Sequence, residues 1–257
     1  MPEKPADDAV SEIIAFLLIF AIVVLAAALL VLINLPAQGT AAEAEHDNLV
    51  MDQIADLKNS IDLLWTTNST GVNETHLISM SPTQATDLAR RLFIAPTLGS
   101  GLLQTGNGTS FIFESDNAGS HYASLLRFTY ASDNKYAPDY TIVYDGGAVF
   151  YGETDKTTYL LLSPISGANP TGNEEIYLVN ATYNTVKTTV GNLPVAVECT
   201  YTGRTTYTGV KNLTFAESMY SESFWTNKTA LGDVRGASPA KKVNITLLEY
   251  NITWSAV

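Results

Sequence analysis

Side chains suited to catalysis are few in this chain of 257 residues. Its three histidines, His46, His76 and His121, lack the spacing of a metal motif such as H-E-x-x-H, and we predict them to be solvated surface residues. The single cysteine, Cys199, stands in the apolar run PVAVECTY, which indicates a buried, inert thiol rather than a nucleophile. A P-loop and a G-x-S-x-G elbow are both absent from the sequence. The sequence therefore predicts no enzyme, no catalytic residue, no metal site and no cofactor.

Two stretches, SDNAGS (115–120) and ASDNK (131–135), gather oxygen-bearing side chains that suit Ca²⁺. Neither matches an EF-hand loop, so we favour ordinary turns and keep a calcium site as the alternative. The many Tyr and Thr residues could line a carbohydrate-binding face, but cross-strand pairs in a sheet explain them more simply.

Asparagines in the N-x-S/T pattern are the most frequent chemical signal in the chain, and all lie after Trp65. This pattern is the acceptor of N-linked glycans, so it predicts a glycosylated outer surface. We expect both Asn244 and Asn251 to point away from the apolar face of the last strand. The predicted sites are Asn68, Asn73, Asn107, Asn180, Asn212, Asn227, Asn244 and Asn251.

Charge and hydropathy exclude one class of partner and indicate another. The formal net charge is −12 and only 16% of residues are charged, so the chain lacks the basic footprint of a nucleic-acid-binding protein. The residues from Ile13 to Ile33 include no charged or hydrogen-bonding side chain. As a helix this run would be roughly 32 Å long, the thickness of a bilayer core, and it is longer than the apolar part of a secretory signal. It predicts a membrane-embedded helix. Lys4 precedes the run and the next Lys or Arg is Lys58, an asymmetry that favours an N-terminus in the cytoplasm.

A second helical pattern follows the apolar run. Apolar residues step by four and three positions, which is typical of an amphipathic helix. Pro36 and Gly39 separate the two patterns and predict a kink or a short non-helical stretch near 34–39. The stripe consists of Val50, Ile54, Leu57, Ile61 and Leu64.

The start of the helix, AVSEIIAFLLIFAIVV from Ala9 to Val24, resembles archaeal type IV pilins and pilin-like proteins. The resemblance covers about residues 7–65. It implies a leader over 1–9, cut by a prepilin peptidase between Ala9 and Val10, and a transmembrane and assembly helix over 10–65. The leader departs from the family pattern because Asp7 and Asp8 stand where these leaders usually carry Lys or Arg.

Glu12 would then be the third residue of the processed chain. One interpretation is that its carboxylate pairs with the new N-terminal amine of an adjacent subunit, because a lone charge in a membrane helix is costly. The simpler interpretation is that an acid in the first turn complements the helix dipole at the headgroup level.

The rest of the chain, residues 66–257, reads as an extracellular head. Short runs rich in Thr, Tyr and Val alternate with Gly, Pro, Asn and Asp, which predicts about nine strands beyond Ser110, with a short helix over 81–93 before them. Asp145-Gly146 predicts a hairpin. The last strand changes phase at Leu247-Leu248, which indicates either a β-bulge or a strand covered on both faces. The expected fold class is α+β, a long helical spine followed by an antiparallel, sandwich-like β head.

These patterns together predict a structural subunit of a pilus-like extracellular filament, with helices in the core and glycosylated heads outside, and a possible role in adhesion. Its expected partners are further copies of itself, the prepilin peptidase, the pilus assembly machinery and the membrane before assembly. The first alternative is a single-pass surface glycoprotein or minor pilin that does not polymerise by itself. An ectoenzyme is the second alternative, and the lack of a catalytic constellation speaks against it.

Overall fold

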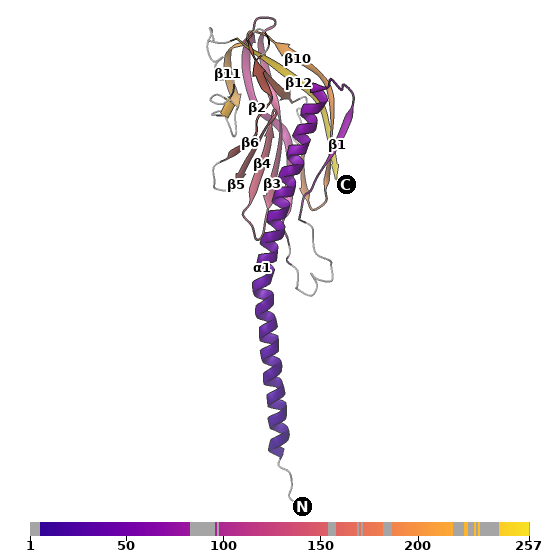
Figure 1. Cartoon of the computed structure of the whole chain (residues 1–257), viewed down its shortest axis with the longest axis vertical. Coiled ribbons are helices and arrows are strands. Elements are labelled where there is room, and N and C mark those ends of the chain that lie inside the picture. The colour runs from indigo at the N-terminus through magenta and orange to yellow at the C-terminus, as the bar shows by residue number, and fades with distance from the viewer. Residues whose placement is uncertain are drawn as a thin grey trace, which may run out of the picture.

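A single long helix carries a β-rich head at its C-terminal end in the computed structural model of the chain (Figure 1). The helix, α1 (Ala6–Thr66), has 61 residues and ends beside the sheets of the head. The predicted α+β class is confirmed. The structure describes residues 6–82, 96, 98–153, 158–168, 170, 172–181, 187–217, 224–225, 229, 231 and 242–256. The short helix predicted over 81–93 falls almost wholly outside these residues.

The helix runs through Pro36 without a non-helical stretch, so the prediction of a short melted segment near 34–39 is wrong. Proline has no N–H and cannot donate to the preceding turn, which costs a helix one hydrogen bond. Neighbouring side chains bond to the backbone on either side of the proline. Asn34 Nδ2 donates to the carbonyl of Leu30 at 2.7 Å, and Thr40 Oγ1 donates to the carbonyl of Pro36 at 3.0 Å.

The head consists of strands that pair into two half-sheets. One half-sheet has the order β1-β10-β12-β8, and β7 also pairs with β8. The other half-sheet has the order β2-β3-β4-β5-β6, and β9 and β11 also pair with β2. They meet where Leu125 of β3 pairs with Asn180 of β8. The strands are β1 (Asn73–Ile78), β2 (Ser100–Ser115), β3 (Gly119–Asp133), β4 (Tyr140–Asp145), β5 (Ala148–Glu153), β6 (Tyr159–Leu162), β7 (Ser166–Ala168), β8 (Glu174–Asn180), β9 (Lys187–Gly191), β10 (Val195–Tyr207), β11 (Lys211–Glu217) and β12 (Val243–Ala256).

The pairing is mixed rather than purely antiparallel, which corrects one part of the predicted fold. Strands β12 and β8 run parallel, with Val243 opposite Glu174 and Glu249 opposite Asn180. Every other pairing between the described strands is antiparallel. The parallel pair is possible because the chain passes through β9, β10 and β11 between β8 and β12, and a connection between parallel strands needs a long crossover.

The last strand is covered on both faces from Val243 to Leu248, which decides between the two interpretations of its phase change. Leu248, Tyr250, Ile252 and Trp254 belong to a core that includes α1, here called the helix-side core. Val243, Ile245 and Leu247 belong to a second core on the other face, here called the far core. The β-bulge lies instead in the partner β10, where the register shifts between Tyr201 and Gly203.

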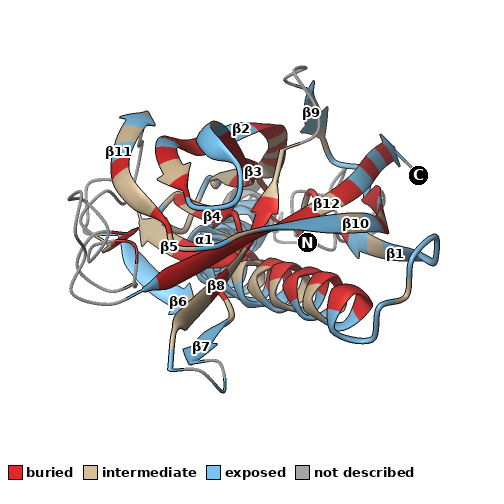
Figure 2. Ribbon diagram, turned by 90° about the horizontal axis from the view of Figure 1, so that it is seen from above, coloured by how far each residue is buried: buried red, intermediate tan, exposed pale blue. Residues whose placement is uncertain are grey.

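The C-terminal half of α1 packs into the helix-side core through the predicted apolar stripe. All five stripe residues are buried, from Val50 at 0% exposed to Leu64 at 4%. Figure 2 shows the buried side of this part of the helix beside β1, β10 and β12. Tyr250 Oη donates to the carbonyl of Ile61, and the ring of Trp65 stacks on Tyr177 with 4.4 Å between centroids.

The predicted hairpin at Asp145-Gly146 is confirmed. Strands β4 and β5 are joined by Gly146 and Gly147, whose φ angles are +59° and +112°. Positive φ at both central residues suits a two-residue hairpin and favours glycine. A Cβ on Gly146 would also lie 2.4 Å from Leu125 Cδ1, so the close packing of β3 requires glycine as well.

Strands β1, β7 and β11 and the first half of β2 were absent from the sequence prediction. Strand β1 is an edge strand with mostly exposed polar side chains, so its sequence resembles a loop. The first half of β2, residues 100–107, includes two glycines that suggest a turn. A Cβ on Gly101 would lie 2.6 Å from Tyr130 Oη, so the glycine makes room for a buried tyrosine of β3. Only the three-dimensional neighbours explain these residues.

Candidate assembly interface

The N-terminal half of α1 projects away from the head with its apolar side chains uncovered. We call residues 11–38 the free segment, since each is exposed except the half-exposed Val31 and Leu35. Leu25 is 62% exposed and Leu32 is 70% exposed. Within the described residues, α1 is the one helix long and apolar enough to cross a membrane. The free segment therefore fits membrane anchoring, and it leaves a continuous apolar surface for lipid or for other helices.

The residues predicted for processing lie just before this segment, and the residue predicted for assembly lies at its start. Ala9 and Val10 lie in the first turns of α1, and the side chain of Glu12 is exposed. None of the described strands of the head comes near them, because these strands pack against the opposite end of the helix (Figure 1). The geometry leaves Glu12 available to a neighbouring chain or to the headgroup region, and both interpretations stay open.

A buried carboxylate fixes the point where the free segment meets the head. Glu43 is 0% exposed, and its two oxygens accept four backbone N–H groups from the head. Oε1 accepts from Gly99 at 3.1 Å and from Lys135 at 2.9 Å. Oε2 accepts from Tyr136 at 2.8 Å and from Ala137 at 2.7 Å. Burial is the largest influence on the pKa of Glu43 and raises it, but the four backbone donors together outweigh burial and hold the pKa below its usual value.

The β3–β4 loop closes over the helix at this junction. A Cβ on Gly39 would lie 2.3 Å from the ring of Tyr136, so the helix lacks a side chain where the tyrosine crosses it. Thr40 Oγ1 lies 3.4 Å from the carbonyl oxygen of Tyr136. The stretch ASDNK, considered above for calcium, spans the end of β3 and the start of this loop, and the N–H of its Lys135 binds Glu43. The loop thus holds one turn of α1 through backbone hydrogen bonds to Glu43.

The junction residues continue the apolar stripe toward the N-terminus. Counting back from Val50 by four, three and four positions gives His46, Glu43 and Gly39, and all three are buried. The stripe predicted from the sequence begins at Val50 because these three residues are not apolar. The helical period alone was the signal that could have found them.

His46 corrects the prediction of a solvated histidine. It is 4% exposed, its ring lies 6.3 Å from that of Tyr130, and its Nε2 has no partner in the part of the chain that the structure describes. Burial lowers the pKa of His46, although Ser79 and Glu43 partly oppose this, so the ring is neutral at pH 7. His76 and His121 are half-buried, and His121 Nε2 lies 2.9 Å from the carbonyl oxygen of Ala118.

A second acid beside the junction titrates near neutral pH. Burial raises the pKa of Asp47 to about 6, contacts with Asn134 and Tyr140 lower it, and the charges of Glu43 and Asp139 add to the rise. In the unfolded chain an aspartate titrates near 3.9. The folded state therefore binds more protons than the unfolded state between these two values, so Asp47 lowers stability as the pH rises through them, and the penalty persists above pH 6.

We expect Asp47→Asn to stabilise the head by about 1–3 kcal/mol near neutral pH and to change little near pH 4, since each pKa unit corresponds to about 1.4 kcal/mol. The measurement is denaturant unfolding of the full chain in detergent at a series of pH values. Asp52→Asn, at an exposed position of the same helix, is the control. An equal pH dependence for wild type and Asp47→Asn would contradict the assignment.

The predicted glycosylation sites differ in access. Asn68, Asn73, Asn107 and Asn251 are exposed, and Asn227 lies outside the described residues. Asn180 and Asn212 are half-buried, and Asn212 Nδ2 donates to Glu114 at 2.9 Å.

Asn244 contradicts the prediction that it points outward. It is 6% exposed, its Oδ1 accepts from the N–H of Gly209 at 3.2 Å, and its Nδ2 lies 3.5 Å from Glu175 Oε1. The reason is that both faces of β12 are covered in this part of the strand. An N-linked glycan attaches to the side-chain amide nitrogen, so the folded head offers no access at Asn244.

The predicted inert thiol is confirmed. Cys199 is 0% exposed in the helix-side core, and burial raises the pKa of its thiol to about 12. A thiol that stays protonated is neither a nucleophile nor a metal ligand at neutral pH.

Comparisons with known proteins place the chain in no family. Neither a protein-family model, nor a curated protein sequence, nor a solved structure matches it.

Proposed function

We propose that the chain is the subunit of a pilus-like extracellular filament. The observation that supports this most is the free segment, an exposed apolar helix held in line with the head by the Glu43 contact. In a membrane, lipid covers the segment. Outside the membrane, the same surface is stabilised only by burial against copies of itself, and the hydrophobic effect then drives assembly.

The position of the junction supports a spine rather than a flexible tether. A tether would connect anchor and head by a polar linker, whereas here one helix is continuous through both. The head would then follow the helix rigidly and form the outer layer, with the exposed sites Asn68, Asn73, Asn107 and Asn251 carrying glycans. We extend the proposal to processing between Ala9 and Val10 and to pairing of Glu12 with the amine of a neighbouring copy.

The alternative is a single-pass surface protein that stays in the membrane. The length of the apolar run fits one bilayer, and the acidic leader with Asp7 and Asp8 lacks the usual basic residues before a cut. The two functions differ in where the mature chain is found and in its first residue.

The test is to shear surface structures from cells and to identify the N-terminus of the chain by mass spectrometry. Filaments that contain the chain beginning at Val10 would support the proposal. Recovery only from detergent-extracted membranes, with residues 1–9 intact, would refute it and support the anchored alternative.

A charge in the middle of the free segment is expected to block both membrane insertion and assembly. Leu25→Asp should cost about 2.5–3.5 kcal/mol in the bilayer and should remove the chain from sheared filaments. The stability of the head should stay unchanged, because Leu25 is exposed and far from the head. Asn59→Asp adds the same charge at an exposed position beyond the free segment and should assemble normally. Normal filaments from Leu25→Asp would contradict the proposed role.

A further inference from the structure

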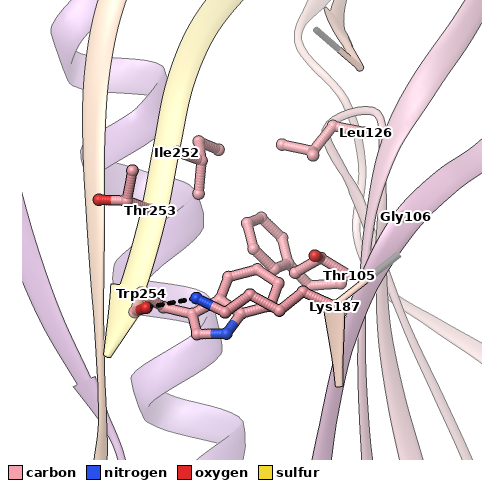
Figure 3. Close-up of a pocket in the computed structure, with 8 residues that line it drawn as sticks. Thr105, Gly106, Leu126, Lys187, Ile252, Thr253 and Trp254 are labelled. Carbon is pink, nitrogen blue, oxygen red and sulfur yellow. Dashed lines mark hydrogen bonds between the residues drawn. The ribbon is translucent and has the colours of Figure 1, made fainter. Parts of the chain in front are cut away.

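A cavity opens in the head where the two half-sheets part. Strand β8 covers one edge of β12 only from Val243 to Glu249, and the rest of β12 continues beyond it. Between this continuation and strands β2, β3 and β9 lies a cavity of about 190 Å³, several times the roughly 30 Å³ of one water in the liquid. Figure 3 shows Ile252 and Trp254 on one side, and Leu126, Thr105 and Lys187 on the other.

The wall of the cavity is apolar and its polar groups are few. Leu126, Phe128, Ile252 and Trp254 are each at least nine-tenths buried and supply the apolar part. Among the described residues that line the cavity there is no Asp, Glu, Asn or Gln. A neutral sugar is usually held by several such acceptors, so the lining favours a ligand that brings its own acceptor.

One cation stands at this wall in a chain of net charge −12. Lys187 Nζ donates to the carbonyl of Trp254 at 2.8 Å and lies 5.0 Å from the centroid of its ring (Figure 3). This carbonyl belongs to the part of β12 that β8 does not reach. An ammonium group has three donors, and this bond uses one of them.

We propose that this cavity binds a small carboxylate with an apolar body, of the arylacetate or branched-chain kind. The carboxylate would accept from Lys187 Nζ, and the body would pack against Leu126, Phe128 and Ile252. Charge-assisted bonds of this type are the strong ones, and the apolar wall strengthens them by excluding water. The site is independent of filament assembly and stands whether or not the chain polymerises.

The test is calorimetric titration of the full chain in detergent with phenylacetate, and with phenylacetamide as the neutral match. We expect saturable binding of phenylacetate with a dissociation constant on the order of 1 mM and at least tenfold weaker binding of the amide. This comparison needs no variant. An equal affinity for the two compounds, or no binding of phenylacetate up to about 10 mM, would overturn the proposal.

Variants assign the binding to Lys187. Lys187→Met should weaken phenylacetate binding about tenfold or more, and Lys187→Arg should largely retain it. Lys211→Met is the matched control, since this lysine pairs with Asp116 away from the cavity. The Lys187→Met chain also controls for uptake of the ligand by the micelle. Unchanged binding by a folded Lys187→Met chain would place the ligand elsewhere.

Discussion

Replacing Glu43 with glutamine is expected to lower the free energy of unfolding of the head by about 3–5 kcal/mol near neutral pH. The carboxylate of Glu43 accepts two backbone N–H groups on each oxygen. Glutamine keeps one oxygen and places an NH₂ group at the other position. In either orientation, two of the four backbone donors then face another donor in a buried site. The measurement is denaturant unfolding of the full chain in detergent.

The pH dependence of this effect has a definite sign. The pKa of Glu43 lies below its usual value in the folded state, so its stabilising contribution is complete above that value. The contribution disappears as the pH falls through the lower, folded pKa. The difference between wild type and Glu43→Gln should therefore be largest near pH 7 and shrink in acid. Glu45→Gln, at an exposed position two residues away, should change stability by less than about 0.5 kcal/mol. A loss below about 1 kcal/mol for Glu43→Gln would show that the four bonds do not hold the junction.

The second large effect is expected for Ile61→Ala, with a loss of about 3–5 kcal/mol. Ile61 is 0% exposed and lies in the helix-side core, so the substitution leaves a cavity between α1 and the sheet. Tyr250 bonds to the backbone carbonyl of Ile61, and this bond survives the change of side chain. The measured loss therefore reports packing. Unfolding of the full chain followed by near-UV circular dichroism provides the number.

Leu63→Ala is the matched control for this prediction. Leu63 lies two residues further along the same helix and is 60% exposed, so its truncation should cost under about 1 kcal/mol. Similar losses for both variants would mean that the helix face assigned here to the core is wrong. Alanine favours helix more than isoleucine does, so propensity works against the expected loss and cannot produce it.

The helical stripe and the Asp145-Gly146 hairpin show what local pattern could predict. Each depends on neighbours within a few residues, because a helix repeats every 3.6 residues and a two-residue turn needs positive φ. The stripe from Val50 to Leu64 was predicted with the correct face. The start of β2 and the edge strand β1 were not predicted. Their residues are explained by partners far along the chain, such as Tyr130, whose hydroxyl occupies the space beside Gly101.

The contact of Glu43 and His46 with the head also depends on residues that are distant in the sequence. His46 was predicted to be a solvated surface residue and Glu43 was not singled out, because a sequence shows a side chain but not the groups that surround it in the fold. The four N–H groups around Glu43 come from residues at least 56 positions away. Asn244 was read as outward for a similar reason, since a pattern of period two does not reveal that both faces of β12 are covered.

The sequence by itself determined the apolar spine, the amphipathic helix after it and the β-rich character of the head, because each follows from composition and short-range periodicity. The tertiary structure alone decided that the helix continues through Pro36, that β12 and β8 run parallel, and that a carboxylate joins spine to head. It also decided where the half-sheets part and leave a cavity beside Trp254. These features depend on which distant backbone groups meet, and that is fixed only when the whole chain has folded around its two cores.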